Sequence, residues 1–279
     1  MSNDPTDYAK NTIGVVAEVM KAAGDNPNVK EAANNLGQTA VTLTKTINNV
    51  LLPLAAVNFA FDKAKAYFAG KFQEDLSEKT AQIPQDQIIE PKASVAGPTL
   101  QGLAFTHEEA DLKEMYLNLL ATSMDQRHAS SAHPAFVEII KQLDGEDAQL
   151  TRVILTGPQS SPIAQIRRKK KGETGFTVLR QHLMNLTYVK TNDPYDNPNL
   201  PAQIDNLIRL GLVTVEYDSY LTDENKYSWI NKRPEFIHCT ESSTEEDTEV
   251  IFQKGILQRT DLGKKFALAV GLSKTQPTL

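Results

Sequence analysis

Two histidines and a group of acidic residues have the side-chain types that could support metal binding or acid–base chemistry. His128 and His133 follow a stretch that begins with Glu108, Glu109 and Asp111. Imidazole and carboxylate groups are common zinc ligands and proton-transfer groups. The acids lie in the first turn of a predicted helix, however, and the histidines lie beyond its end, about 25 Å away at 1.5 Å per residue. The sequence therefore predicts no catalytic and no metal site here, unless a second subunit brings these groups together.

The stretch AHPAFVEII at 132–140 gives His133 a local structural role. Pro134 is suited to the first position of a helix, and apolar residues from Phe136 to Leu143 then repeat at helical spacing. His133 is therefore expected beside the N-cap, and no serine or cysteine nucleophile motif accompanies it. Asp144 is expected to cap the next helix, with Asp147 three residues further on.

The stronger catalytic motifs are absent from the sequence. It contains no GxxxxGK[ST] phosphate loop, no GxGxxG after a strand, no HExxH and no GxSxG. Its one cysteine, Cys239, can form neither an internal disulfide nor a CxxC metal site. We therefore predict a non-enzymatic protein without a cofactor.

Composition indicates a globular protein of one large or two ordinary domains. The 279 residues are 40% hydrophobic and carry a formal charge of -6, which argues against a protein built to coat nucleic acid or an anionic membrane. The start lacks the features of a secretory signal, so we expect a cytoplasmic location. The apolar run at 50–61 is shorter than the roughly 20 residues that span a bilayer. It favours a buried helix; conditional insertion of residues 47–69 into a membrane is the alternative.

A heptad-like pattern runs through the first third of the chain. Apolar residues alternate at spacings of four and three, which is typical of helices that pack as in coiled coils. Pro53 should kink or divide this helix. The seam needs a partner surface, either the first predicted helix at 8–23 or a second subunit. Its main positions are Leu36, Leu43, Ile47, Val50, Leu54, Val57 and Phe61.

The middle of the chain alternates between predicted helices and breaks. Three prolines in 83–99 predict a connector rather than a helix. A helix then begins after Thr106 as N-cap and ends near Gln126, and another is predicted at 175–190. The basic run between them is expected to be a solvated loop, with contact to phosphate or an acidic partner as the functional alternative. It consists of Arg167, Arg168, Lys169, Lys170 and Lys171.

The last eighty residues show the order of elements of a winged helix. An amphipathic helix at 199–210 ends at Gly211, a strand follows, and a long polar excursion leads to a second strand and a helix capped by Thr260. Residues 216–249 carry ten acids and three bases, so this predicted wing should repel a phosphate backbone. Protein interaction is therefore favoured over DNA binding.

Residues 108–154 resemble the abortive-infection alpha family, a bacterial domain family of unknown function. The resemblance rests on LKEMYLNLLATSMD, HPAFVEIIKQL and the pair Asp147–Ala148, and downstream on NLIRLGLV at 206–213 and TDLGKKFALAV at 260–270. It implies a bacterial or phage-defence context and a helical body with a C-terminal winged helix. It supplies no catalytic residues.

Together these patterns predict a mainly α fold with a small β component. We expect long N-terminal helices with coiled-coil-like packing at 1–82, a connector at 83–105, a central helical bundle at 106–190 and a winged-helix-like module at 191–279. The predicted function is phage defence through helix-mediated assembly and protein–protein interaction. A protein partner or a homo-oligomer is expected. A DNA-binding regulator and a conditionally membrane-active effector are the alternatives.

Overall fold

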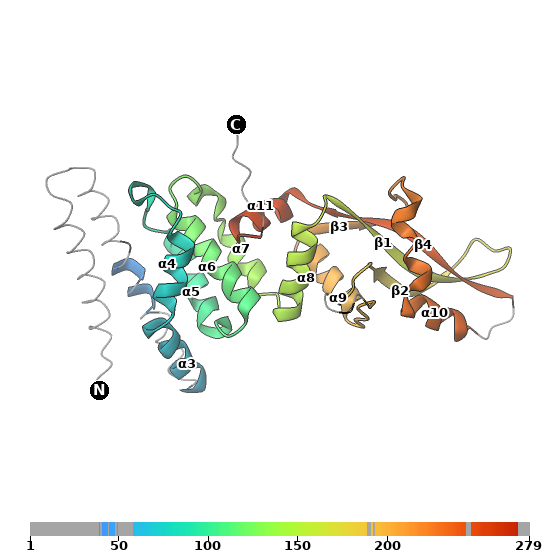
Figure 1. Cartoon of the computed structure of the whole chain (residues 1–279), viewed down its shortest axis with the longest axis horizontal. Helices are drawn as coiled ribbons and strands as arrows, with labels where there is room; N and C mark the ends of the chain where they lie inside the picture. The colour runs from blue at the N-terminus through green and yellow to red at the C-terminus, as the bar shows by residue number, and fades with distance from the viewer. Residues whose placement is uncertain are drawn as a thin grey trace. The chain divides into compact units, whose positions relative to one another are not determined.

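The chain folds into two compact units (Figure 1). The computed structural model describes residues 39, 41–43, 45–47, 49, 58–188, 191, 193–243 and 247–272. Unit 1 comprises Met1–Gln149 and Lys265–Leu279, and unit 2 comprises Leu150–Lys264. The described part of unit 1 is helical, whereas unit 2 contains a β-sheet.

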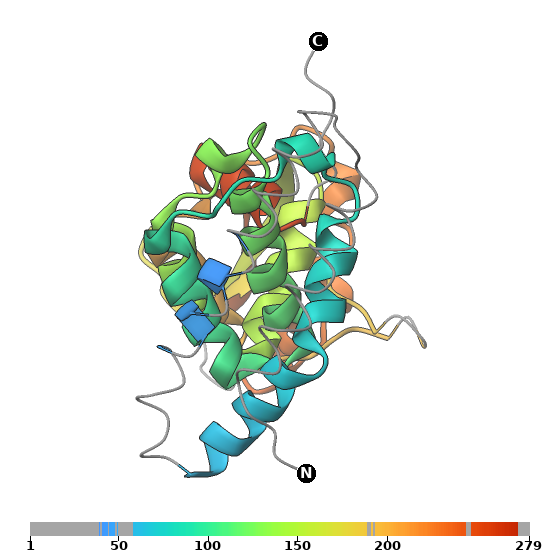
Figure 2. The ribbon, with the colours of Figure 1, turned by 90° about the vertical axis from the view of Figure 1, so that its left-hand side faces the viewer.

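Unit 1 is built around one buried helix, α6. Its neighbours α4, α5 and α7 all contact it, and Figure 2 shows this helical unit from its end. Both broad faces of α6 are covered, because Met115, Leu117 and Leu120 are each fully buried. The helices of this unit are α3 (Asn58–Ala69), α4 (Phe72–Thr80), α5 (Ala93–Thr106), α6 (Ala110–Met124) and α7 (Pro134–Ile140), with short 3-10 turns at Gln85–Gln87 and Ala129–Ser131. Helices α8 (Gly145–Thr156) and α11 (Asp261–Ala269) each belong partly to unit 1 and partly to unit 2.

Helix α5 lies inside the region predicted to be a connector, so the expectation that prolines exclude a helix there is wrong. Pro98 is within α5, where it removes one intrahelical hydrogen bond. Packing offsets this loss, because Leu100 and Leu103 are fully buried and Gly102 lets α6 approach closely. A Cβ atom at Gly102 would lie 2.3 Å from the Cζ atom of Tyr116.

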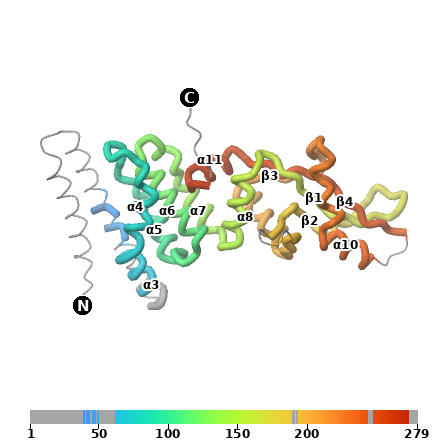
Figure 3. Tube along the Cα trace, in the orientation of Figure 1, coloured from blue at the N-terminus to red at the C-terminus, as the bar shows by residue number. Residues whose placement is uncertain are grey.

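Unit 2 contains a four-stranded antiparallel sheet with the order β2-β1-β4-β3. The longest pairing joins β1 and β4, from Ser160 opposite Gln258 to Lys170 opposite Thr248, and the two strands can be followed side by side in Figure 3. The strands are β1 (Ser160–Lys170), β2 (Thr177–Leu183), β3 (Val213–Glu216) and β4 (Thr248–Arg259), and the helices are α9 (Leu200–Arg209) and α10 (Pro234–Glu241), with 3-10 turns at Glu224–Tyr227 and Ile230–Lys232.

This sheet overturns the predicted fold class: the protein is a mixed α/β fold, not a mainly α bundle with a winged helix. The basic run predicted as a loop is the end of β1, and the segment predicted as a helix at 175–190 contains β2. Strand β1 is covered on both faces at its centre, so Ile163, Ala164 and Ile166 are all buried and show no two-residue alternation. That loss of alternation hid the strand from the sequence pattern.

The predicted acidic wing is also wrong, because the described residues between β3 and β4 do not form an open loop. Part of this segment packs against the sheet and contributes to the hydrophobic core of unit 2. Tyr227 and Ile230 are buried against Ala164, Ile166 and Leu183, and a further ring of half-buried side chains surrounds them: Leu179, Leu221, Trp229, Phe236, Cys239, Val250 and Phe252. Buried apolar residues spaced through this polar segment therefore hold it against the sheet.

Several local predictions are confirmed and two are wrong. The helix start at Pro134 is confirmed, but His133, expected beside the N-cap, is itself the N-cap of α7, and its Nδ1 accepts a hydrogen bond from the Ala135 N–H at 3.1 Å. Asp144 and Thr260 accept the corresponding bonds at the starts of α8 and α11. Thr106 is not an N-cap, because it is the last residue of α5 and its hydroxyl donates back to the Gly102 carbonyl. Among the described residues no helix is both long and apolar enough to cross a bilayer.

Candidate functional site

A pocket of about 460 Å³ opens in unit 2 between β2 and the starts of two helices. Its walls are residues 180–183 of β2, the segment 196–201 that leads into α9, and Pro234, Glu235 and His238 of α10. Volumes of roughly 300–1,000 Å³ are typical of pockets that enclose small ligands or side chains. This pocket is the candidate site for recognition.

The strand wall of the pocket is shaped by a bulge at His182. Between the pairs Ala164–Leu183 and Ile166–Arg180, β2 advances three residues while β1 advances two, so β2 carries one extra residue. His182 adopts a φ of 57° at this point, a left-handed conformation that costs a residue with a Cβ on the order of 1 kcal/mol. Such a conformation persists only where surrounding contacts hold it.

Three hydrogen bonds hold His182 in place. Its Nε2 lies 3.1 Å from Asp205 Oδ1, its Nδ1 lies 3.0 Å from the Tyr217 hydroxyl, and its backbone N–H donates to that same hydroxyl at 3.0 Å. A carboxylate only accepts, so Nε2 carries the proton and Nδ1 of the neutral ring accepts from Tyr217. Asp205 belongs to α9 and Tyr217 follows β3, so His182 joins β2 to both elements.

The bonding of His182 indicates a structural rather than a catalytic role. Burial lowers the pKa of His182, against the opposing effect of Asp205, and burial raises the pKa of Tyr217 to about 12. Both ring nitrogens are engaged, which leaves no nitrogen free to take a proton from a substrate. Cys239 is no better placed as a nucleophile, because burial raises the pKa of its thiol.

Arg233 fixes the other side of the pocket. The guanidinium is only 2% exposed and donates to the carbonyl oxygens of Leu186 and Tyr195 at 3.0 and 2.9 Å. It also forms a two-point ion pair with Glu235. Glu235 lines the pocket, so Arg233 both neutralises that carboxylate and ties α10 to the chain segment after β2.

The remaining ionisable side chains of the pocket face solvent. Arg180, Asp196 and His238 are exposed, and among the described residues no hydrogen-bond or ion-pair partner holds their side chains. The charge of Arg180 opposes the effect of burial on the pKa of the Cys239 thiol. The pocket therefore offers a cation and an anion to an incoming ligand.

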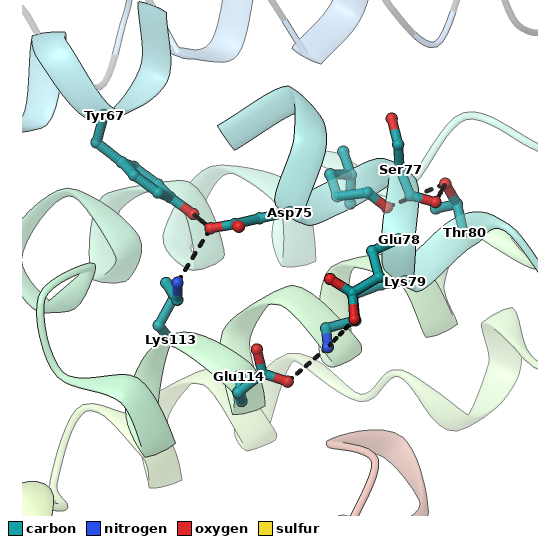
Figure 4. Close-up of polar contacts among 9 residues, drawn as sticks. Tyr67, Asp75, Ser77, Glu78, Lys79, Thr80, Lys113 and Glu114 are labelled. Carbon is teal, nitrogen blue, oxygen red and sulfur yellow. Dashed lines mark hydrogen bonds and ion pairs between the residues drawn. The ribbon is translucent and has the colours of Figure 1, made fainter. Parts of the chain in front are cut away.

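Unit 1 has a different kind of polar cluster, drawn in Figure 4. The buried Asp75 carboxylate accepts from the Tyr67 hydroxyl at 3.2 Å and from Lys113 Nζ at 3.1 Å. Burial and the Asp75 charge raise the pKa of Tyr67 above its ordinary value. Lys79 pairs with Glu114 at 2.6 Å beside this cluster. These groups satisfy one another across α3, α4 and α6, so the cluster stabilises helix packing.

The predicted basic run lies at the end of β1, opposite an acidic stretch. Lys169 pairs with Glu249 at 3.1 Å, and Lys170 lies 3.9 Å from Glu173. The Arg167 guanidinium stacks on the Phe176 ring at 3.8 Å. Antiparallel pairing thus brings Glu249 beside Lys169, Glu173 lies three residues after Lys170, and a contact of the basic run with phosphate or an acidic partner stays a prediction.

Two positions of the predicted helix seam, Leu43 and Ile47, are buried. Leu36, Val50, Leu54 and Val57 lie outside the described residues, as does the side chain of Phe61, and so do Pro53 and the predicted first helix. An assembly role for the seam stays a prediction.

The structure does not bring the two histidines and the acidic residues together as one site. These residues are His128, His133, Glu108, Glu109 and Asp111. Glu108 forms an ion pair with Lys63 of α3 at 2.7 Å, and His133 caps α7. In the part of the chain that the structure describes, no three histidine, cysteine or acidic side chains form a group that could hold a metal.

Sequence reasoning missed His182 and Arg180 as pocket residues and Arg233 as the partner of the lining residue Glu235. His182 was one of five scattered histidines, and both it and Arg180 were assigned to a helix. Arg233 was counted only as a charge of the wing. One signal was available, since Pro234 is suited to the first position of a helix and so indicates that α10 begins directly after Arg233.

Comparison with known proteins supports one relationship. The family model described as abortive infection alpha matches residues 64–270. No curated protein and no solved structure matches the chain significantly.

Proposed function

Because the chain belongs to the abortive infection alpha family, we propose that it acts in defence against phage by binding a protein partner through unit 2. The proposal places the protein in the cytoplasm and assigns it no reaction. Helix-mediated assembly through the seam that includes Leu43 and Ile47 belongs to the same proposal.

One observation carries the proposed binding role: the pocket of unit 2 is open and presents unpartnered charges. Buried charged groups such as Asp75 and Arg233 are matched within the chain, whereas Arg180 and Asp196 have no partner among the described residues. Exposed charges of this kind steer and orient a partner at an interface.

The charge of unit 2 opposes DNA binding as the function. Residues 150–264 contain fifteen basic and fifteen acidic residues, so the formal charge of -6 belongs to the rest of the chain. DNA-binding domains draw most of their affinity from excess positive charge, which neutralises phosphates. A neutral unit with acids beside its basic run lacks this source of affinity.

A phage challenge tests the proposal. Bacteria that express the chain would be infected with a panel of phages, and plating efficiency would be compared for the natural sequence, Arg180→Glu and Asp196→Lys. Lys226→Glu and Asp218→Lys are matched controls, because they reverse exposed charges of unit 2 outside the pocket. The proposal predicts that the natural chain and both controls lower plating efficiency, whereas the pocket variants lose this effect. Equal protection by all five chains would contradict a role for the pocket.

A further inference from the structure

We propose that β2 accepts an extended segment of the partner protein as an additional strand, and that an acidic side chain of this segment binds Arg180. This inference rests on the proposed function, since it specifies the partner that the pocket of unit 2 would take. It follows from the free edge of β2, from the charges of the pocket and from the composition of its walls.

The first argument is that β2 lies at an edge of the sheet. It pairs with β1 on one side, and in the described part of the chain no strand pairs with its other side. Thr177, Val178, Arg180 and Gln181 are exposed. An edge strand presents backbone N–H and C=O groups without strand partners, and extended peptides bind such edges by adding a strand.

The bulge at His182 limits this edge and joins it to the pocket. Strand β2 pairs with β1 in register at Thr177 and Val178, and one extra residue interrupts the ladder between Val178 and Arg180 and another between Arg180 and Leu183. The pocket begins at Arg180, which lies between these two interruptions of the ladder. A strand added along 177–181 would therefore reach the pocket at one end.

The second argument concerns charge. Arg233 neutralises the Glu235 carboxylate. This carboxylate therefore repels an incoming acidic side chain less than an unpaired carboxylate would. Arg180 is the exposed cationic side chain among the residues that line the pocket. Asp196 is the one lining carboxylate without a described partner, and it disfavours a second acidic side chain close to the segment 196–201. The charges thus favour one acid, directed toward Arg180.

The third argument is the nature of the other walls. Pro198, Pro201 and Pro234 line the pocket, and proline has no backbone N–H to donate. These three wall positions therefore offer a ligand no backbone donor, whereas β2 offers the Arg180 side chain and the N–H groups of its edge. This distribution suits a peptide backbone that lies along β2 better than a small anion, which needs donors from several directions.

Selection of peptides provides the test. A phage-displayed library of random heptapeptides would be selected on the immobilised full chain, on Arg180→Glu and on the control Lys226→Glu. The proposal predicts β-branched sequences with Asp or Glu at one fixed position for the natural chain and the control. It predicts Lys or Arg at that position for Arg180→Glu. No enrichment on the natural chain, or the same sequences from Arg180→Glu, would overturn the inference.

Hydrogen exchange then locates the bound peptide. A synthetic peptide of the selected sequence should slow amide exchange within 177–183, and Arg180→Glu should raise its dissociation constant about tenfold or more. Slowed exchange elsewhere in the chain with none in 177–183 would refute strand addition. Binding should survive millimolar free phosphate or glutamate; displacement by either one would mean that the pocket takes a small anion instead. Loss of phage protection by Arg180→Glu without selection of acidic peptides would refute this inference and leave the proposed function standing. Selection of acidic peptides by the natural chain, together with unchanged phage protection by Arg180→Glu, would refute only the proposed function.

Discussion

Replacement of Arg233 by methionine should strongly destabilise unit 2. Methionine retains the apolar stem of the side chain but removes donors to Leu186, Tyr195 and Glu235. Removing one partner of a buried ion pair costs about 3–5 kcal/mol, because the other charge remains buried and unpaired. Glu235 has a side chain only 15% exposed, so it cannot recover its full hydration in the variant.

The chain contains a convenient local probe for this prediction. Trp229 is its only tryptophan, and it packs against the same core of unit 2. Urea unfolding followed by Trp229 fluorescence should therefore report on this unit. With a slope of about 2 kcal/mol per molar urea, a loss of 3–5 kcal/mol lowers the midpoint by roughly 1.5–2.5 M.

Two further variants separate the ion pair from simple loss of a side chain. Lys232→Met alters the exposed neighbouring cation and should leave the midpoint within about 0.3 M of the natural value. The double variant Arg233→Met with Glu235→Gln should recover about 1–3 kcal/mol, because it removes the unpaired carboxylate. An Arg233→Met midpoint that equals the Lys232→Met midpoint would refute the assigned role of Arg233.

Three more predictions follow from the packing and the titration of the chain. Gly102→Ala should cost about 1–3 kcal/mol through overpacking between α5 and α6, whereas Gly97→Ala in the same helix has open space and should be neutral or gain up to about 1 kcal/mol; equal thermal midpoints would contradict this packing. The folded-state pKa of His182 is lowered, so stability should fall as the pH drops below the unfolded value of about 6.5 toward the folded value. In His182→Asn, which tolerates the left-handed conformation, this part of the pH dependence of urea unfolding should disappear, and an unchanged profile would exclude His182 as its source. Leu43→Asp or Ile47→Asp should shift the mass measured by light scattering if the seam joins two copies, and an unchanged mass with retained folding would confine the seam to one chain.

Local structure was predictable from the sequence where short-range chemistry decides it. The caps at Asp144 and Thr260 were recognisable because each depends on a side chain and a backbone N–H three residues away, and Pro134 marked the start of α7. Helix α9 was recognisable from its apolar face, and Gly211 ends it with a φ of 73°.

The sheet was not predictable, because its evidence lies in contacts between distant segments. Lys169 and Glu249 are eighty residues apart in the sequence and adjacent in the ladder, so each charge run seemed to be a solvated loop when considered alone. The pocket was not predictable for the same reason. Its polar groups come from β2, from the segment before α9 and from α10, and neither the bulge at His182 nor the pairing of Arg233 with Glu235 has a local sequence pattern.

Photocrosslinking during infection tests the central claim most directly. A photoreactive amino acid would replace Gln181, which is exposed and lines the pocket, and in a control chain it would replace Lys226. The account predicts a crosslinked protein that appears on infection with the position 181 probe and not with the control, with the crosslink in an extended segment that carries an acidic residue. No adduct at position 181 in cells that are protected from phage, or identical adducts from both positions, would contradict it.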